Sequence, residues 1–197
     1  MRKIAFIAAV AAGVVATPAA AQSGAWVAAI VGQDEIEFST EDYNTDESDL
    51  LYGVGAGYDF AVTPGVFVGV EVEYSESEAE VSDTDGGITA GFEADGDIYA
   101  GIRVGANVGN TVAVYAKGGY TSVSLNAFAT DGVDVLEADE SYGGFRIGAG
   151  VEAAIGGNFL VRAEYRYSDY GEIASFEELG TLDFNRSQFV AGVGFKF

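Results

Sequence analysis

Apolar and polar residues alternate with a period of two along most of the chain after residue 50. In the segment 66–74, every even-numbered residue is Val or Tyr, whereas the odd-numbered residues include Gly69, Glu71 and Glu73. In the segment 189–197, the odd-numbered residues are Phe, Ala or Val, and glycines and Lys196 occupy even positions. Alternation over about nine residues is typical of a β-strand with one apolar face.

This pattern predicts eight strands. Seven show it clearly: Tyr52–Phe60, Val66–Tyr74, Ile98–Val108, Val112–Tyr120, Phe145–Ala153, Phe159–Tyr167 and Phe189–Phe197. The eighth is expected near Ala25–Phe38, where residues 26–31 are apolar on both faces, so the pattern does not show which face is which.

The predicted connections alternate in length. Residues 61–65, 109–111 and 155–158 are short and rich in Gly, Asn and Pro, which favours tight turns. The four other connections, 39–50, 75–96, 125–141 and 168–183, are long and polar. An even number of strands with this alternation predicts an all-β fold, an eight-stranded antiparallel up-and-down barrel.

The polar face of these strands carries mostly glycine and a balanced set of charges. This composition indicates whether the face meets water or the interior of the barrel. Six basic residues and five acidic residues, Asp59 among them, fall on it. Buried charges must be paired, so this face is expected inside the barrel and the apolar face against lipid, as in a transmembrane β-barrel. A soluble periplasmic barrel with an apolar interior is the alternative. The predicted ion network of the lumen consists of Glu71, Glu73, Arg103, Lys117, Arg146, Glu152, Arg162, Glu164, Arg166 and Lys196.

The interior of an eight-stranded barrel is just wide enough for side chains, so we expect this network to plug the lumen. A gate or an ion path is the alternative.

The first 21 residues have the features of a secretory signal peptide. A basic start is followed by the apolar run 4–15 and by small residues before Gln22. We therefore expect a cleaved signal peptide at 1–21 and one barrel domain at 22–197. Without Arg2 and Lys3 the chain has seven basic and 31 acidic residues, a net charge of −24.

Composition excludes several functions. A charge this negative excludes nucleic-acid binding through a basic face. The absence of Cys and His excludes thiolate nucleophiles, Ser–His–Asp triads and imidazole zinc sites. We expect no catalytic residue, no cofactor and no metal site, with a mechanism based on carboxylates alone as the remaining enzymatic alternative.

The alternation that ends on Phe197, together with the segments 148–152 and 162–170, resembles the small outer-membrane β-barrel family, the opacity-type and OmpA/OmpX-type surface barrels of Gram-negative bacteria. The resemblance implies a location in the outer membrane. It also implies an assembly signal, read by the barrel-assembly machinery, at Phe189, Val193, Phe195 and Phe197. We expect a monomer.

These observations predict an integral outer-membrane protein with a structural or surface-interaction role. Its long acidic loops are either simply solvated or form a surface that binds divalent cations and joins the lipopolysaccharide layer. A narrow porin-like channel for small solutes or cations is the alternative function.

Overall fold

The computed structural model describes residues 23–39, 44–77, 80–85, 88–130, 135–176 and 180–197. The predicted signal peptide lies outside these residues. The described chain forms nine strands: β1 (Gly24–Ser39), β2 (Asn44–Thr63), β3 (Val66–Ser77), β4 (Glu80–Asp85), β5 (Ile88–Val108), β6 (Val112–Thr130), β7 (Val135–Ile155), β8 (Phe159–Phe176) and β9 (Gly180–Lys196). Within the described ranges, no helix is long and apolar enough to cross a membrane.

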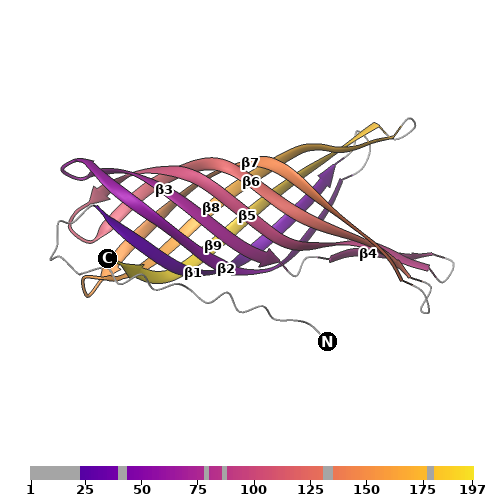
Figure 1. The fold of residues 1–197 in the computed structure, drawn as a ribbon, viewed down its shortest axis with the longest axis horizontal. Helices are drawn as coiled ribbons and strands as arrows, with labels where there is room; N and C mark the ends of the chain where they lie inside the picture. Colours follow the sequence, from indigo (N-terminus) through magenta and orange to yellow (C-terminus); the bar gives the residue numbers. More distant parts are fainter. Residues whose placement is uncertain (1–22, 40–43, 78–79, 86–87, 131–134, 177–179) are drawn as a thin grey trace.

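Eight of these strands close into an antiparallel barrel (Figure 1). The order around the sheet is β3-β2-β1-β9-β8-β7-β6-β5, and β3 pairs with β5 to complete the ring, from Val66↔Ala106 to Glu76↔Gly96. The short β4 pairs with β5 beyond the end of β3. Closure satisfies the backbone hydrogen bonds of every strand at membrane depth, which lipid requires. The predicted eight-stranded fold is therefore confirmed.

Side chains alternate between a polar interior and an apolar outer face. On β3, Val70 and Val72 point outward and are 51% and 56% exposed, whereas Glu71 and Glu73 point inward and are buried. The structure also shows which face of β1 points inward, which the sequence pattern left open. Trp26 is buried and Val27 is exposed, so even-numbered residues there face the lumen. An outer wall of Val, Ile and aromatic side chains does not suit water, so the soluble alternative is wrong.

The tight turns lie where the sequence predicts them, at one end of the barrel together with the C-terminus (Figure 1). Gly65 and Gly109 adopt φ angles of +89° and +79°, a left-handed conformation that glycine adopts without a Cβ clash. We call this the turn end.

The prediction of long loops at the other end was largely wrong. Strands β2, β5, β6 and β7 run for 19 to 21 residues and continue through most of the segments expected to be loops. Pairing between β6 and β7, for example, continues to Thr130↔Val135. Beyond the membrane a strand needs no apolar face, so its sequence loses the alternation while its backbone keeps its ladder.

The long strands separate into two arms beyond the ring (Figure 1). Strands β7 and β8 pair only from Phe145↔Asp169 to Ile155↔Phe159, and β2 and β3 pair only up to Leu51↔Ser77. The parts of β5, β6 and β7 that extend beyond the ring, away from the turn end, therefore form one arm with β4. The corresponding parts of β8, β9, β1 and β2 form the other arm. The sequence segments 35–49, 76–95, 131–140 and 169–183 hold 24 acidic residues and no basic residue, and 17 of these acidic residues lie among the described residues. We call the end of the molecule formed by the described parts of these segments the acidic end.

Candidate functional site

The lumen is filled by charged side chains that balance one another. Seven acidic and seven basic residues point into it: Asp34, Asp59, Glu71, Glu73, Asp97, Glu152 and Glu164, with Arg103, Lys117, Arg146, Arg162, Arg166, Arg186 and Lys196. All are buried except Lys196, which lies at the turn end with its side chain 27% exposed. Every one of these carboxylates contacts a Lys or an Arg, in keeping with the high cost of an unpaired buried charge.

The cluster nearest the turn end is centred on Arg103 of β5. Its Nε and Nη2 donate to the two carboxylate oxygens of Asp59 at 2.8 and 2.7 Å, and its Nη1 donates to Glu152 at 3.2 Å. Lys196 adds a 2.7 Å contact to the same Asp59. A bidentate guanidinium–carboxylate pair fixes both side chains in one geometry.

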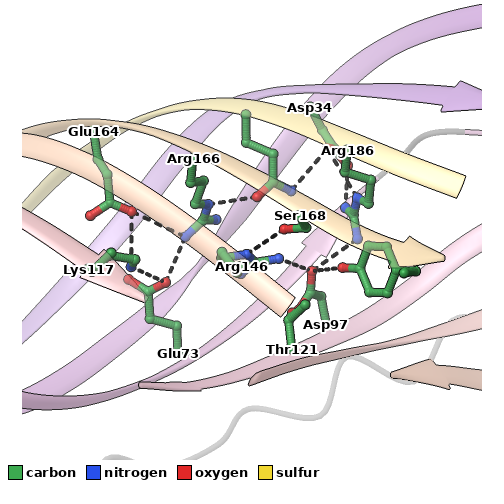
Figure 2. Close-up of polar contacts among 12 residues, drawn as sticks. Asp34, Glu73, Asp97, Lys117, Thr121, Arg146, Glu164, Arg166, Ser168 and Arg186 are labelled. Atoms are coloured by element: carbon green, nitrogen blue, oxygen red, sulfur yellow. Dashed lines mark hydrogen bonds and ion pairs between the residues drawn. The ribbon is translucent and has the colours of Figure 1, made fainter. Parts of the chain in front are cut away.

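The central cluster surrounds Lys117 of β6. Its Nζ lies 2.8 Å from Glu71 Oε1, 3.0 Å from Glu73 Oε2 and 3.0 Å from Glu164 Oε1. Arg166 Nη1 donates to the same Glu73 oxygen at 2.7 Å (Figure 2). Three carboxylates thus share two cations.

The third cluster, nearest the acidic end, is centred on Asp97 of β5 (Figure 2). Its Oδ2 accepts hydrogen bonds from Arg146 Nη2 at 2.5 Å and from Arg186 Nη1 at 3.0 Å, and its Oδ1 accepts one from Thr121 at 2.7 Å. Arg186 also forms an ion pair with Asp34 of β1. The network therefore continues around the wall at this level.

Two of these contacts cross the full width of the barrel. In the closed ring, β3 and β8 are four strands apart in either direction, and so are β5 and β9. Glu73–Arg166 joins the first pair of walls and Asp97–Arg186 joins the second. Side chains that meet across the diameter close the lumen at two levels.

The structure places all ten residues predicted for the lumen network on the inner face. The sequence analysis missed three further charged residues, Asp34, Asp97 and Arg186. Asp34 lies on the strand whose faces could not be assigned, and the other two fall at the ends of strands that the apolar pattern cut short. The period of two could have found them, because residues 97, 99, 101 and 103 share one face, as do 186, 188, 190 and 192.

Three residues of the expected assembly signal lie on the outer face of β9, and the fourth, Phe197, directly follows this strand. Phe189, Val193, Phe195 and Phe197 are each at least half exposed. The ring centroids of Phe189 and Tyr165 are 4.8 Å apart, and those of Phe195 and Phe159 are 5.5 Å apart. Recognition of this face by the assembly machinery stays a prediction.

The acidic side chains that the structure describes in these segments lie at the surface. Glu35 and Asp169 are exposed, and Asp49 and Glu76 are half-buried; the other acidic side chains of these segments lie outside the described residues. Among the described side chains, no group of three or more acidic residues is arranged to hold a metal ion.

Comparison with known proteins agrees with this architecture. Residues 5–197 match the family described as Outer membrane protein beta-barrel domain, and the chain belongs to this family. It is an integral outer-membrane barrel. It is 35% identical to the 25 kDa outer-membrane immunogenic protein of Brucella melitensis over 76% of this chain and 66% of that protein. It is 31% identical to the 31 kDa outer-membrane immunogenic protein of the same organism, over 61% of this chain and 53% of that protein.

The alignments thus span between half and two thirds of the length of these relatives. Among solved structures, Ail, the attachment invasion locus protein of Yersinia pestis, aligns with a TM-score of 0.56 over 88% of this chain and 99% of that chain. The sequence identity is 14%, so this likeness concerns the fold.

Proposed function

We propose that this protein is a surface protein in which a barrel with a plugged lumen anchors an acidic, cation-binding end outside the cell. The observation that carries the proposal is the separation of charge along the chain. All seven basic residues after residue 21 lie in the lumen, where seven acidic residues neutralise them. The other 24 acidic residues all fall in the sequence segments 35–49, 76–95, 131–140 and 169–183, which contain no basic residue.

The backbone register also pairs acidic positions of the sequence in these arms. Glu80 is the register partner of Glu93, and Glu172, beside a register shift, is the partner of Asp183. Because these segments contain 24 acidic residues and no basic residue, counter-ions from solution should stabilise the arms. Divalent cations fit this role best, because they prefer carboxylate oxygens and can link them to the phosphates of lipopolysaccharide.

The orientation follows from the family's architecture. Outer-membrane barrels have short turns on the periplasmic side and longer extensions on the outside, which assigns the acidic end to the cell surface. The Brucella relatives are named as outer-membrane immunogenic proteins, which agrees with exposure of this end. No catalytic role is proposed, because every described lumen carboxylate is ion-paired.

Binding to lipopolysaccharide tests the proposal. The refolded protein in an uncharged detergent is titrated with purified lipopolysaccharide in calcium chloride, and separately in sodium chloride of equal ionic strength. We expect calcium to tighten binding about tenfold or more beyond the sodium control. A variant with Glu80→Gln, Glu93→Gln, Glu172→Gln and Asp183→Asn should lose most of the calcium effect. Equal binding in the two salts would contradict the proposal.

A narrow cation channel is the second candidate. Charges at the acidic end concentrate cations at that mouth of the barrel, which favours cation entry. Conduction would require the contacts Glu73–Arg166 and Asp97–Arg186 to open, since both cross the lumen.

A further inference from the structure

Near the turn end, two guanidinium groups lie over the indole ring of Trp26. The Cζ atom of Arg162 is 3.9 Å from the ring centroid, and that of Arg103 is 4.8 Å away. Trp26 is 1% exposed and Arg162 is 5% exposed. Stacking of this kind is favourable, and it leaves the in-plane N–H groups of both partners directed away from the stack, where they need acceptors.

The two arginines differ in how fully those N–H groups are used. Arg103 donates from Nε, Nη1 and Nη2 to Asp59 and Glu152. Arg162 has one long contact, from Nη2 to Glu152 at 3.4 Å. Its Nε and Nη1, together with Trp26 Nε1, have no hydrogen-bond partner among the described residues.

These three unpartnered groups are all donors, and the charge around them is positive. An indole N–H and a guanidinium can only donate. Two carboxylates, Asp59 and Glu152, face three cations at this level, namely Arg103, Arg162 and Lys196. A buried donor without an acceptor is destabilising, so a negatively charged acceptor is favoured here.

The carboxylates of the central cluster, which outnumber its cations, do not accept hydrogen bonds from these donors. Tyr115 stands between the two clusters, since its hydroxyl donates to Glu164 at 2.8 Å while its ring lies 6.0 Å from Arg162 Cζ. The third carboxylate there, Glu71, contacts Lys117.

Packing limits the size of an acceptor. Trp26 packs with Ala28 and Leu160, and a Cβ atom added at Gly192 would lie 2.8 Å from Arg162 Cγ. An anion at this position must therefore be small and carry little hydration.

We propose that Trp26 and Arg162 bind a small monovalent anion of halide size, with chloride as the physiological occupant, at the turn end of the lumen. The anion accepts hydrogen bonds from Arg162 Nε and Nη1 and from Trp26 Nε1. It compensates the positive surplus of this cluster and completes the plug.

Trp26 reports directly on this site because it is the single tryptophan of the chain. The refolded protein in uncharged detergent is titrated with sodium iodide, which quenches indole fluorescence, with sodium fluoride keeping the ionic strength constant. We expect quenching that saturates, and chloride at ten times its own dissociation constant should shift the iodide midpoint about tenfold by mass action. Caesium fluoride, a cationic quencher, should have little effect.

Two variants locate the site. Arg162→Met should abolish saturable quenching, whereas Ala163→Met, at the next residue of the same strand and exposed on the outer face, should keep it. Correct folding of each is checked by heat-dependent gel mobility. If a variant does not fold, the wild-type titration still decides. Absent quenching, or quenching that rises linearly and ignores chloride, would show that water satisfies these donors and would overturn the proposal, as would unchanged saturation in folded Arg162→Met.

Discussion

Asp97 of β5 accepts a hydrogen bond from Arg186 of β9 at 3.0 Å, although the two residues stand on opposite walls of the barrel. The same carboxylate accepts hydrogen bonds from Arg146, Thr121 and Tyr170, so one buried acid holds side chains from five strands together. A centre of this kind stabilises only while it is complete, because each arginine is buried away from water.

Removal of this carboxylate therefore gives the first prediction. Asp97→Asn keeps the size of the side chain and leaves Arg146 and Arg186 with too little negative charge. We expect it to lower the free energy of unfolding by about 3–5 kcal/mol, measured by urea titration in phospholipid vesicles. The control is Glu35→Gln, an exposed position on β1, which should change stability by less than about 0.5 kcal/mol. Similar small effects at both positions would contradict the account.

The orientation of the wall gives the second prediction. Val70 is 51% exposed on the outer face of β3, within the apolar belt. Val70→Arg should destabilise the barrel in a bilayer by about 2–4 kcal/mol, because a charge at that depth faces hydrocarbon. Thr111→Arg, in the turn between β5 and β6, should have almost no effect in the same urea titration. Equal tolerance of the two arginines would mean that Val70 does not face lipid.

The close approach of the β5 backbone to β6 gives the third prediction, which compares adjacent glycines on β6. A Cβ at Gly119 would lie 2.3 Å from the backbone oxygen of Ala100, whereas a Cβ at Gly118 would meet nothing closer than 3.6 Å. Gly119→Ala should cost about 1–3 kcal/mol through overpacking, and Gly118→Ala should be nearly neutral. Thermal unfolding followed by gel mobility ranks the two, and the reverse order would be inconsistent with this register.

The C-terminal residue gives the fourth prediction. Phe197 and Phe60 are similarly exposed, at 50% and 54%, and both are surface aromatics near the turn end. If the end of β9 is the assembly signal, Phe197→Ser should slow insertion by the reconstituted assembly machinery several-fold. Phe60→Ser should slow it much less, and neither change should prevent spontaneous folding in detergent. Equal slowing by both would assign the effect to the aromatic girdle instead.

The sequence predicts the fold well where lipid constrains it. In the segments 52–60 and 66–74, for example, one face must be apolar and the other must fit a crowded interior, so the alternation is clear in both. Outside the membrane neither constraint applies. The pairing of Thr130 with Val135 therefore has no counterpart in the apolar pattern, and the two arms were predicted as loops.

The residues of the candidate site could be predicted only within the membrane-spanning part of the strands, where the alternation is present. Glu73 and Arg166 are recognisable because each is a charged residue between two apolar or aromatic neighbours in an alternating segment, 66–74 and 159–167. Asp97 and Arg186 lie where that flanking pattern ends, so their sequence context does not distinguish them from loop residues. Which acid meets which base depends on distances across the barrel, and these come from closure of the ring rather than from any local segment.

Single-channel recording in a planar bilayer tests the central claim, a lumen closed by ion pairs beneath an acidic surface. The refolded wild-type protein is compared with a variant in which Glu73, Arg166, Asp97 and Arg186 are all replaced by Ala, which removes both contacts between opposite walls. We predict a silent wild-type barrel and measurable conductance in the variant, with folding of each verified by heat-dependent gel mobility. Steady cation-selective steps from the wild-type protein would contradict the claim and identify the lumen as a channel.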